Sequence, residues 1–106
     1  MNVDNAKSQM RKGMLEYCIM LLLKDQPCYS SDIIGRLKEA NLLVVEGTLY
    51  PLLTRLKNDG VLAYEWQEST QGPPRKYYVL SEEGRQMLEA LEEAWTEIES
   101  AVNKLK

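Results

Sequence analysis

The chain has 106 residues, 44% of them hydrophobic and 27% charged, and its formal net charge is −3. This length fits one domain with a modest core that would gain from a partner, and no apolar run approaches the roughly 20 residues needed to cross a bilayer. The chain has no histidine, and it shows no phosphate-binding loop, metal-ligand cluster or activated nucleophile. We therefore expect neither an enzyme nor a metal or cofactor site.

The cysteines and the N-terminus bear on the cellular compartment. Cys18 lies in an apolar run and Cys28 stands beside a proline, so the two form no disulfide framework. The first residues lack the apolar stretch and the small-residue cleavage site of a secretory signal. We therefore expect a cytoplasmic protein with two reduced thiols, and a redox-sensing thiol is the alternative.

The charge is unevenly distributed along the chain. Residues 1–80 carry 10 Lys and Arg against 9 Asp and Glu, whereas residues 81–106 carry 3 against 7. Because the acid is concentrated at the end, the negative net charge does not exclude contact between the first part and nucleic acid.

Apolar residues at helical spacing predict a first helix over residues 8–24, with an apolar arc wide enough for burial on more than one side. Three cations, Lys7, Arg11 and Lys12, cluster at its start, where the helix dipole would favour acids. They form either a solvated basic end or contacts to phosphate.

A turn containing a proline, at residues 26–29, precedes a second predicted helix. We expect Ser30 or Ser31 to cap this helix and Asn41 to end it. Capping explains both serines, since no base is present to make a nucleophile of either one. Residues 42–45 then form a short extended link.

Residues 46–60, EGTLYPLLTRLKNDG, predict a short helix with two different faces. Its leucines recur at i, i+3, i+4 and i+7, as on a surface that faces a core: Leu49, Leu52, Leu53 and Leu56. The opposite face carries small or hydrogen-bonding groups: Gly47, Tyr50, Pro51, Thr54, Arg55 and Asn58. Proline is tolerated in a first turn, so the helix is expected to begin near residues 46–48, and Gly60 is a suitable stop. We predict that residues 46–59 form a recognition helix.

The period changes from helix to strand after the recognition helix. Residues 61–68 and 75–80 predict two strands, joined by a loop of turn formers at residues 69–74. Arg75 and Lys76 follow the loop directly, and no acid lies between residues 69 and 80. A charge pair on a hairpin is usually solvated surface, but a hairpin after a recognition helix is also where a winged helix places its phosphate-binding wing.

Ser81 is expected to cap a long last helix with Glu82 and Glu83 in its first turn. Apolar residues follow at spacings of four and three, with others alongside, and predict a seam for a partner helix. The seam residues are Met87, Leu91, Ala94, Trp95, Ile98, Ala101, Val102 and Leu105. A symmetric dimer is the commonest source of such a partner.

The expected fold is therefore mainly α with a small β-hairpin: a winged helix-turn-helix in residues 1–80, and a dimerisation helix in residues 81–106, in one compact unit. Three stretches carry a resemblance to a known family: KSQMRKGMLEYCIMLLL, EGTLYPLLTRLKNDGVL and QGPPRKYYVLSEEGR. Together they resemble the short form of the PadR-family transcriptional regulators over nearly all of residues 8–104.

This resemblance implies a homodimer that binds a palindromic operator in double-stranded DNA, usually as a repressor, and releases it when an effector arrives. By position, Thr48, Tyr50, Pro51 and Arg55 would face the major groove, and Gly72, Arg75 and Lys76 the backbone or the minor groove. The chain departs from the family at the start of the second helix, where Tyr29 is followed by Ser30 in place of the usual glycine. The full set of expected DNA contacts is Lys7, Arg11, Lys12, Ser30, Ser31, Thr48, Tyr50, Pro51, Thr54, Arg55, Asn58, Gly72, Arg75 and Lys76.

Trp95 matches a tryptophan that multidrug-sensing members of this family place on the last helix, where two copies sandwich a flat aromatic ligand. Met14 and Tyr17 would be the additional walls of such a site. The alternative is that Trp95 only packs the dimer interface.

A second function remains open beside the DNA-binding regulator. A winged-helix module that binds only proteins would also fit the acidic tail and the modest number of cations. DNA binding that weakens with salt distinguishes the two.

Overall fold

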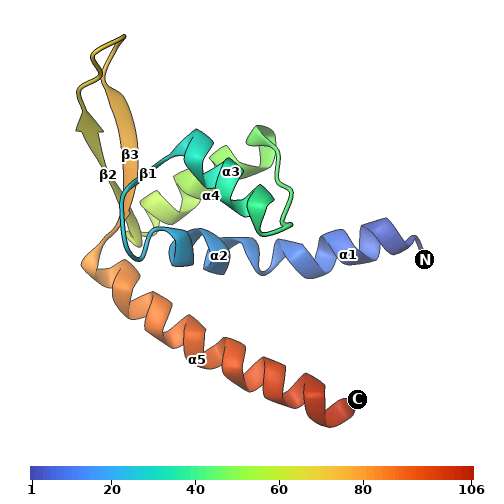
Figure 1. Cartoon of the computed structure of the whole chain (residues 1–106). Helices are drawn as coiled ribbons and strands as arrows, with labels where there is room; N and C mark the ends of the chain where they lie inside the picture. The colour runs from blue at the N-terminus through green and yellow to red at the C-terminus, as the bar shows by residue number, and fades with distance from the viewer.

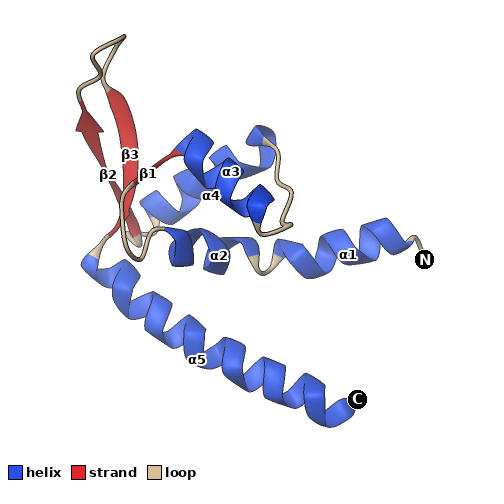
Figure 2. Ribbon diagram, viewed as in Figure 1, coloured by secondary structure: helices blue, strands red, loops and turns tan.

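A computed structural model describes all residues, 1–106, as five helices and a three-stranded antiparallel sheet (Figures 1 and 2). The predicted fold class, mainly helical with a small hairpin, is confirmed. The molecule measures 53 × 32 × 23 Å, because the hairpin and the last helix project away from a small helical centre. The first helix and the end of the last helix point to the same side.

The predicted first helix over residues 8–24 is wrong, since the structure has two helices there. Helix α1 spans Val3–Lys12 and helix α2 spans Leu15–Leu22. The Asn2 side chain caps α1 by accepting hydrogen bonds from the backbone N–H groups of Asp4 and Asn5, at 2.8 and 3.2 Å. The break falls at Gly13, the residue with the weakest helix preference in this stretch.

Helix α3, Ser30–Glu39, has Tyr29 as its N-cap residue, so the prediction that a serine caps it is wrong. Asp32 supplies the contact instead, because its Oδ2 accepts a hydrogen bond from the Tyr29 backbone N–H at 3.1 Å. The helix also ends two residues before Asn41, which adopts a left-handed φ of 65°. This lets the chain reverse, and Leu42 N–H donates to a carbonyl of the last turn.

Helix α4, Glu46–Asn58, begins where the recognition helix was expected to begin and ends one residue earlier than predicted. Leu49, Leu53 and Leu56 are buried in the core and Leu52 packs against it, so the leucine stripe is confirmed. Gly60, with a φ of 83°, ends the helix in the left-handed region as predicted. Pro51, however, lies in the second turn and not in the first, and it has no N–H to donate to the preceding turn.

The sheet contains one strand that no sequence pattern predicted. Strands β2, Leu62–Gln67, and β3, Arg75–Leu80, form the expected hairpin. Strand β1, Cys28–Tyr29, pairs antiparallel with β3, opposite Tyr78 and Tyr77, and gives the order β1-β3-β2. This short strand attaches the segment before α3 to the hairpin.

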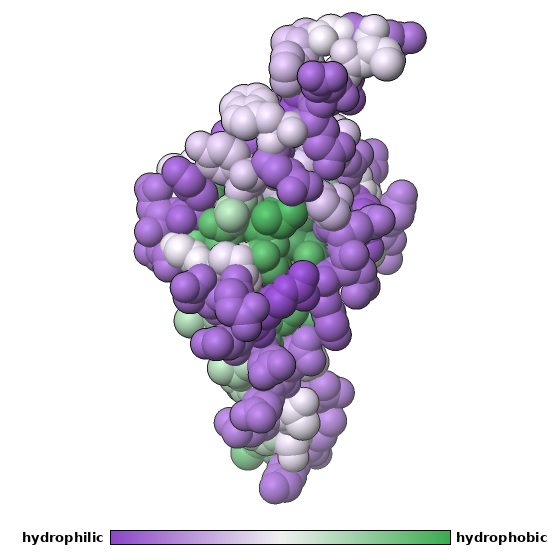
Figure 3. All heavy atoms as spheres, turned by 90° about the vertical axis from the view of Figure 1, so that its left-hand side faces the viewer, coloured by the Kyte–Doolittle hydropathy of each residue, from purple (hydrophilic) through white to green (hydrophobic).

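The core lies between α2, α3, α4 and the base of the hairpin. Its most deeply buried members are Ile19, Met20, Ile33, Leu37, Leu49 and Leu53. Figure 3 shows hydrophobic residues gathered below the hairpin and framed by hydrophilic ones. The free Cys18 and Cys28 are partly and fully buried, and burial raises the pKa of the Cys18 thiol.

Helix α5, Glu82–Leu105, begins at a tight corner. Ser81 caps it as predicted, because its Oγ accepts a hydrogen bond from Gly84 N–H at 2.9 Å. The same hydroxyl donates to the carbonyl of Gly60, and Ser81 N–H donates to the carbonyl of Val61 at 3.1 Å. Gly84 itself packs so closely on Val61 that a Cβ would overlap the Val61 carbonyl.

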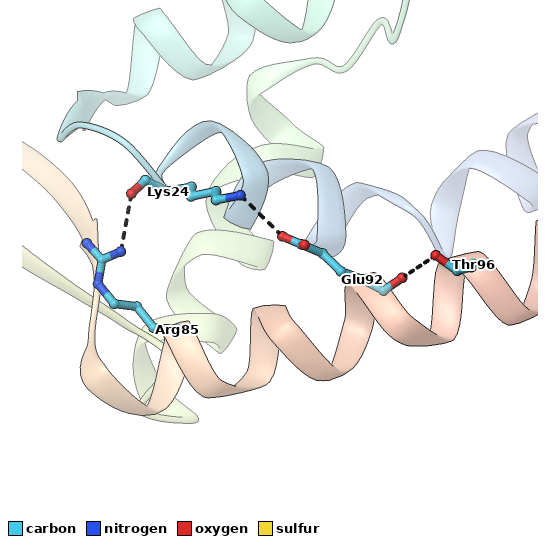
Figure 4. A network of polar contacts seen from close by, with 4 residues as sticks. All are labelled: Lys24, Arg85, Glu92 and Thr96. Carbon is cyan, nitrogen blue, oxygen red and sulfur yellow. Dashed lines mark hydrogen bonds and ion pairs between the residues drawn. The ribbon is translucent and has the colours of Figure 1, made fainter.

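Polar contacts hold the first half of α5 against the turn that follows α2 (Figure 4). Arg85 donates to the carbonyl of Lys24 at 3.3 Å, and Lys24 Nζ lies 3.6 Å from the Glu92 carboxylate. Leu88 is buried and Leu91 partly buried beside them. No helix in the structure is long and apolar enough to span a membrane.

Candidate nucleic-acid interface

A groove of about 290 Å³ runs between the N-terminus of α3, helix α4 and the hairpin. Nine residues line it: Tyr29, Ser30, Tyr50, Thr54, Trp66, Pro74, Arg75, Lys76 and Tyr78. Two of them are cations and none is an acid. The groove therefore suits an anionic surface.

On the helical side of the groove, one side-chain hydrogen bond joins α3 to α4. Ser30 Oγ and the Tyr50 hydroxyl lie 3.1 Å apart, so each can satisfy the other. Ser30 is buried, whereas Tyr50 keeps 44% of its surface exposed. The bond holds the Tyr50 hydroxyl at the start of α3, while the side chain lines the groove and stays partly exposed.

Aromatic rings support the cations on the hairpin side. Lys76 Nζ lies 4.7 Å from the centre of the Tyr64 ring and 5.5 Å from that of Tyr78, and the Arg75 guanidinium lies 5.3 Å from the Tyr29 ring. Cation–π contacts restrict both side chains without neutralising their charge. The cations thus remain available to an anion.

Lys57 of α4 also lies beside the hairpin. Its Nζ lies 5.1 Å from the centre of the Tyr64 ring, and its side chain is exposed. Lysine on a helix is commonly solvated surface, so its place beside the hairpin was not predicted. Only the packing of α4 on β2 reveals it.

The other flank of α4 faces the first two helices. Arg55, predicted to contact the major groove, forms an ion pair with Glu16 of α2. Thr48 lines a separate groove of about 390 Å³ together with Arg11 and Lys12 of α1. The central face of α4, with Pro51 and Asn58, is exposed between these two flanks.

The structure therefore brings together some of the predicted contacts and separates others. Ser30, Tyr50, Thr54, Arg75 and Lys76 share one groove. Ser31 instead lines a different groove along α3 with Cys28 and Arg36, Lys7 is exposed on α1, and Gly72 lies in the hairpin loop.

The three residues predicted for an effector lie on or beside α2 and α5. Met14 is at the junction of α1 and α2, and Trp95 is 38% exposed on α5. Burial is the main cause that raises the pKa of Tyr17, and the negative charge of the Glu92 carboxylate raises it further. Tyr17 is partly buried and packs against the core, and Glu92 lies one turn before Trp95 on α5.

A model of the transcriptional regulator PadR-like family matches residues 19–90, from within α2 to the first turns of α5. The chain belongs to the PadR-like family. The matched region includes every residue that lines the groove. Regulators of this family are DNA-binding proteins without enzymatic activity.

Solved structures of PadR-like proteins agree with this fold along more than nine tenths of the chain. A PadR-like transcription factor from Bacteroides fragilis is 68% identical, with 96% of this chain and 99% of that chain covered and a TM-score of 0.80. A PadR-like transcriptional regulator from Bacillus cereus is 33% identical, with coverages of 92% and 95% and a TM-score of 0.83. For a PadR-family regulator from Eggerthella lenta these values are 33%, 97%, 90% and 0.82.

The PadR-like chain also has groove residues that sequence reasoning missed. Tyr29 and Tyr78 come from β1 and β3, and Trp66 from β2. The alternation of Tyr64 and Trp66 along one strand was the available signal, because side chains two residues apart on a strand share a face, and their ring centres lie 6.3 Å apart. It did not show that this face points toward α4.

Proposed function

We propose that this PadR-like regulator is a homodimeric repressor that binds a palindromic operator. The observation that carries the proposal is the groove in which the α3–α4 pair and the hairpin present Tyr50, Thr54, Arg75 and Lys76 together. An arrangement of helix and hairpin around one acid-free groove suits a duplex, whose backbone is anionic and whose major groove admits a helix.

Helix α4 is the element that would enter the major groove. Its exposed face holds Gly47, Pro51 and Asn58, with Tyr50 and Thr54 on the side of the wing, residues 62–80. These groups are short or can donate and accept hydrogen bonds, as contact with base edges requires. Arg75 and Lys76 of the wing would bind phosphates, and Gly72 would let the loop approach the backbone.

The exposed apolar stripe along α5 supports a dimer. Met87, Trp95, Ile98, Val102 and Leu105 are between 38% and 87% exposed, although all five are large and apolar. The seam they form needs a partner, and a second copy with the same seam satisfies it symmetrically. Two such copies would present two recognition helices to two half-sites.

The proposal also includes an effector, a planar aromatic compound bound near Trp95. Two Trp95 side chains near a dimer axis would form a slot for a planar aromatic compound, with Tyr17 and Met14 as further walls. A ligand that separates the α5 helices would change the distance between the recognition helices and oppose DNA binding reciprocally. The competing role for Trp95 is packing within the dimer.

The direct test is selection of genomic fragments that the purified protein retains. We expect a short palindromic site and binding whose log affinity falls linearly with log salt concentration. Repression is then measured with a reporter gene downstream of the recovered site.

A winged-helix module that binds only proteins gives the opposite result. Such a module would retain no fragment above background at any salt concentration. A selected site that lacks two-fold symmetry would contradict the palindromic operator while keeping DNA binding.

A further inference from the structure

Trp66 is the most exposed aromatic side chain of the molecule. It keeps 64% of its surface accessible, compared with 44% for Tyr50 and 38% for Trp95. Trp66 lies on β2, away from the apolar seam of α5, so a dimer along that seam leaves it uncovered. A large apolar ring left in water at a groove is typical of a binding surface.

The indole of Trp66 is held in a defined place. Trp66 is the direct cross-strand partner of Lys76, and its ring meets the Tyr64 ring edge to face, with a centroid distance of 6.3 Å and an angle of 82°. Across the groove are Tyr50 and Thr54 of α4. The wing thus presents an ammonium group and an apolar ring side by side toward the recognition helix.

The partner of this surface must be anionic and apolar at once. Arg75 and Lys76 attract anions, no acid lines the groove, and the exposed indole needs a hydrophobic contact. The backbone of duplex DNA has this alternation, because each phosphate is followed by a deoxyribose with an apolar face. We propose that Trp66 is a DNA-contacting residue whose indole packs on the deoxyribose next to a phosphate that Lys76 binds.

This inference rests on the proposed DNA binding and adds a contact of a different kind. Since the indole carries no charge, its contact releases no counterion, and its loss lowers affinity at every salt concentration alike. Since every nucleotide has the same sugar, its loss leaves sequence preference unchanged. These two properties separate Trp66 from the cations beside it and from α4.

The experiment compares the wild-type protein with Trp66→Phe and Trp66→Ala, using a 30-base-pair duplex of mixed sequence at low salt. Trp66→Ala should weaken binding about tenfold, the effect of half-burying an indole, with the slope of log affinity against log salt unchanged. Trp66→Phe retains a ring and should lose about threefold or less. Circular dichroism and thermal unfolding verify that each variant is folded.

Tryptophan emission gives a readout independent of affinity. Duplex DNA should protect the wild-type protein from quenching by acrylamide, and the protection should disappear in Trp66→Phe, in which only Trp95 emits. Binding of DNA with Trp66 still fully accessible to acrylamide would overturn the inference and leave the proposed function intact. Protection that depends on protein concentration without DNA would also overturn it, because a second copy would then cover the ring. Absence of any DNA binding would overturn the proposed function itself.

Discussion

Ser30 and Tyr50, twenty residues apart, share one hydrogen bond of 3.1 Å that joins the start of α3 to the recognition helix. Tyr50→Phe removes it and leaves the buried Ser30 hydroxyl without its partner. We expect the free energy of unfolding to fall by about 1 kcal/mol, measured by urea denaturation. Tyr77→Phe is the control, since its hydroxyl makes no hydrogen bond within the chain. Equal stability of the two variants would contradict the role of this bond.

The wing cations should account for part of the salt dependence of DNA binding. Arg75→Ala and Lys76→Ala each remove one charge, and each should lower the slope of log affinity against log salt by about one unit. The measurement is fluorescence anisotropy of a labelled duplex at several salt concentrations. Lys104→Ala, at the far end of α5, should leave the slope unchanged, and an equal effect of all three variants would exclude a specific role for the wing.

The seam of α5 should control assembly. Ile98→Glu places a carboxylate in the middle of the exposed apolar stripe, where burial in a dimer would cost several kcal/mol. We expect a monomer in sedimentation velocity and the loss of operator binding. Ser100→Glu adds the same charge to the polar side of the helix, beside Thr96 and Asn103, and should remain dimeric. A dimeric Ile98→Glu variant would place the interface elsewhere.

Gly84 should tolerate no side chain. In Gly84→Ala the new Cβ would overlap the Val61 carbonyl, so either α5 moves away from the corner or stability falls by several kcal/mol. Gly35→Ala, in the interior of α3 with nothing within 4 Å of the new Cβ, should gain about 0.5–1 kcal/mol. Thermal unfolding measures both, and similar melting temperatures for the two variants would argue against the close packing at Gly84.

Dye binding to the wild-type protein and to Trp95→Ala tests whether Trp95 forms a site for an aromatic effector. Planar cationic dyes should bind the wild-type protein, quench Trp95 emission and lower DNA affinity. In Trp95→Ala, with Trp66 as the remaining tryptophan, both effects should be lost. Dye binding of equal strength in Trp95→Ala would place the site elsewhere, and a wild-type protein that binds no dye would assign Trp95 to interface packing.

Elements with a strong local signal were predictable from the sequence. The leucine spacing of α4, the six residues of β3 and the Ser81 cap of α5 depend on neighbours in the chain, and each is confirmed. The two-residue strand β1 is too short to show a period, and it exists only because β3 lies beside it.

The sequence predicted which side of α4 is exposed, but not which elements pack against the two flanks of that side. Helical spacing placed Tyr50 and Arg55 on the outer side of α4, which is correct for both. It could not show that α2 approaches one flank and supplies Glu16 to Arg55, while the hairpin approaches the other with Tyr64 and Trp66. Such pairings depend on how elements dock, and a single sequence contains no direct record of docking.

The corner at Ser81 makes α5 a lever arm. The Ser81 hydroxyl donates a hydrogen bond to the carbonyl of Gly60, which follows α4, and Gly84 packs on Val61, which precedes β2. The end of α4, the start of the hairpin and the start of α5 therefore meet at this corner. The 24 residues of α5 extend about 36 Å from that point. A rotation of about 5° at the corner therefore becomes a displacement of about 3 Å at the far end of the helix. In the proposed dimer, a small change in how the two α5 helices lie against each other would therefore change the angle between the two α4 helices.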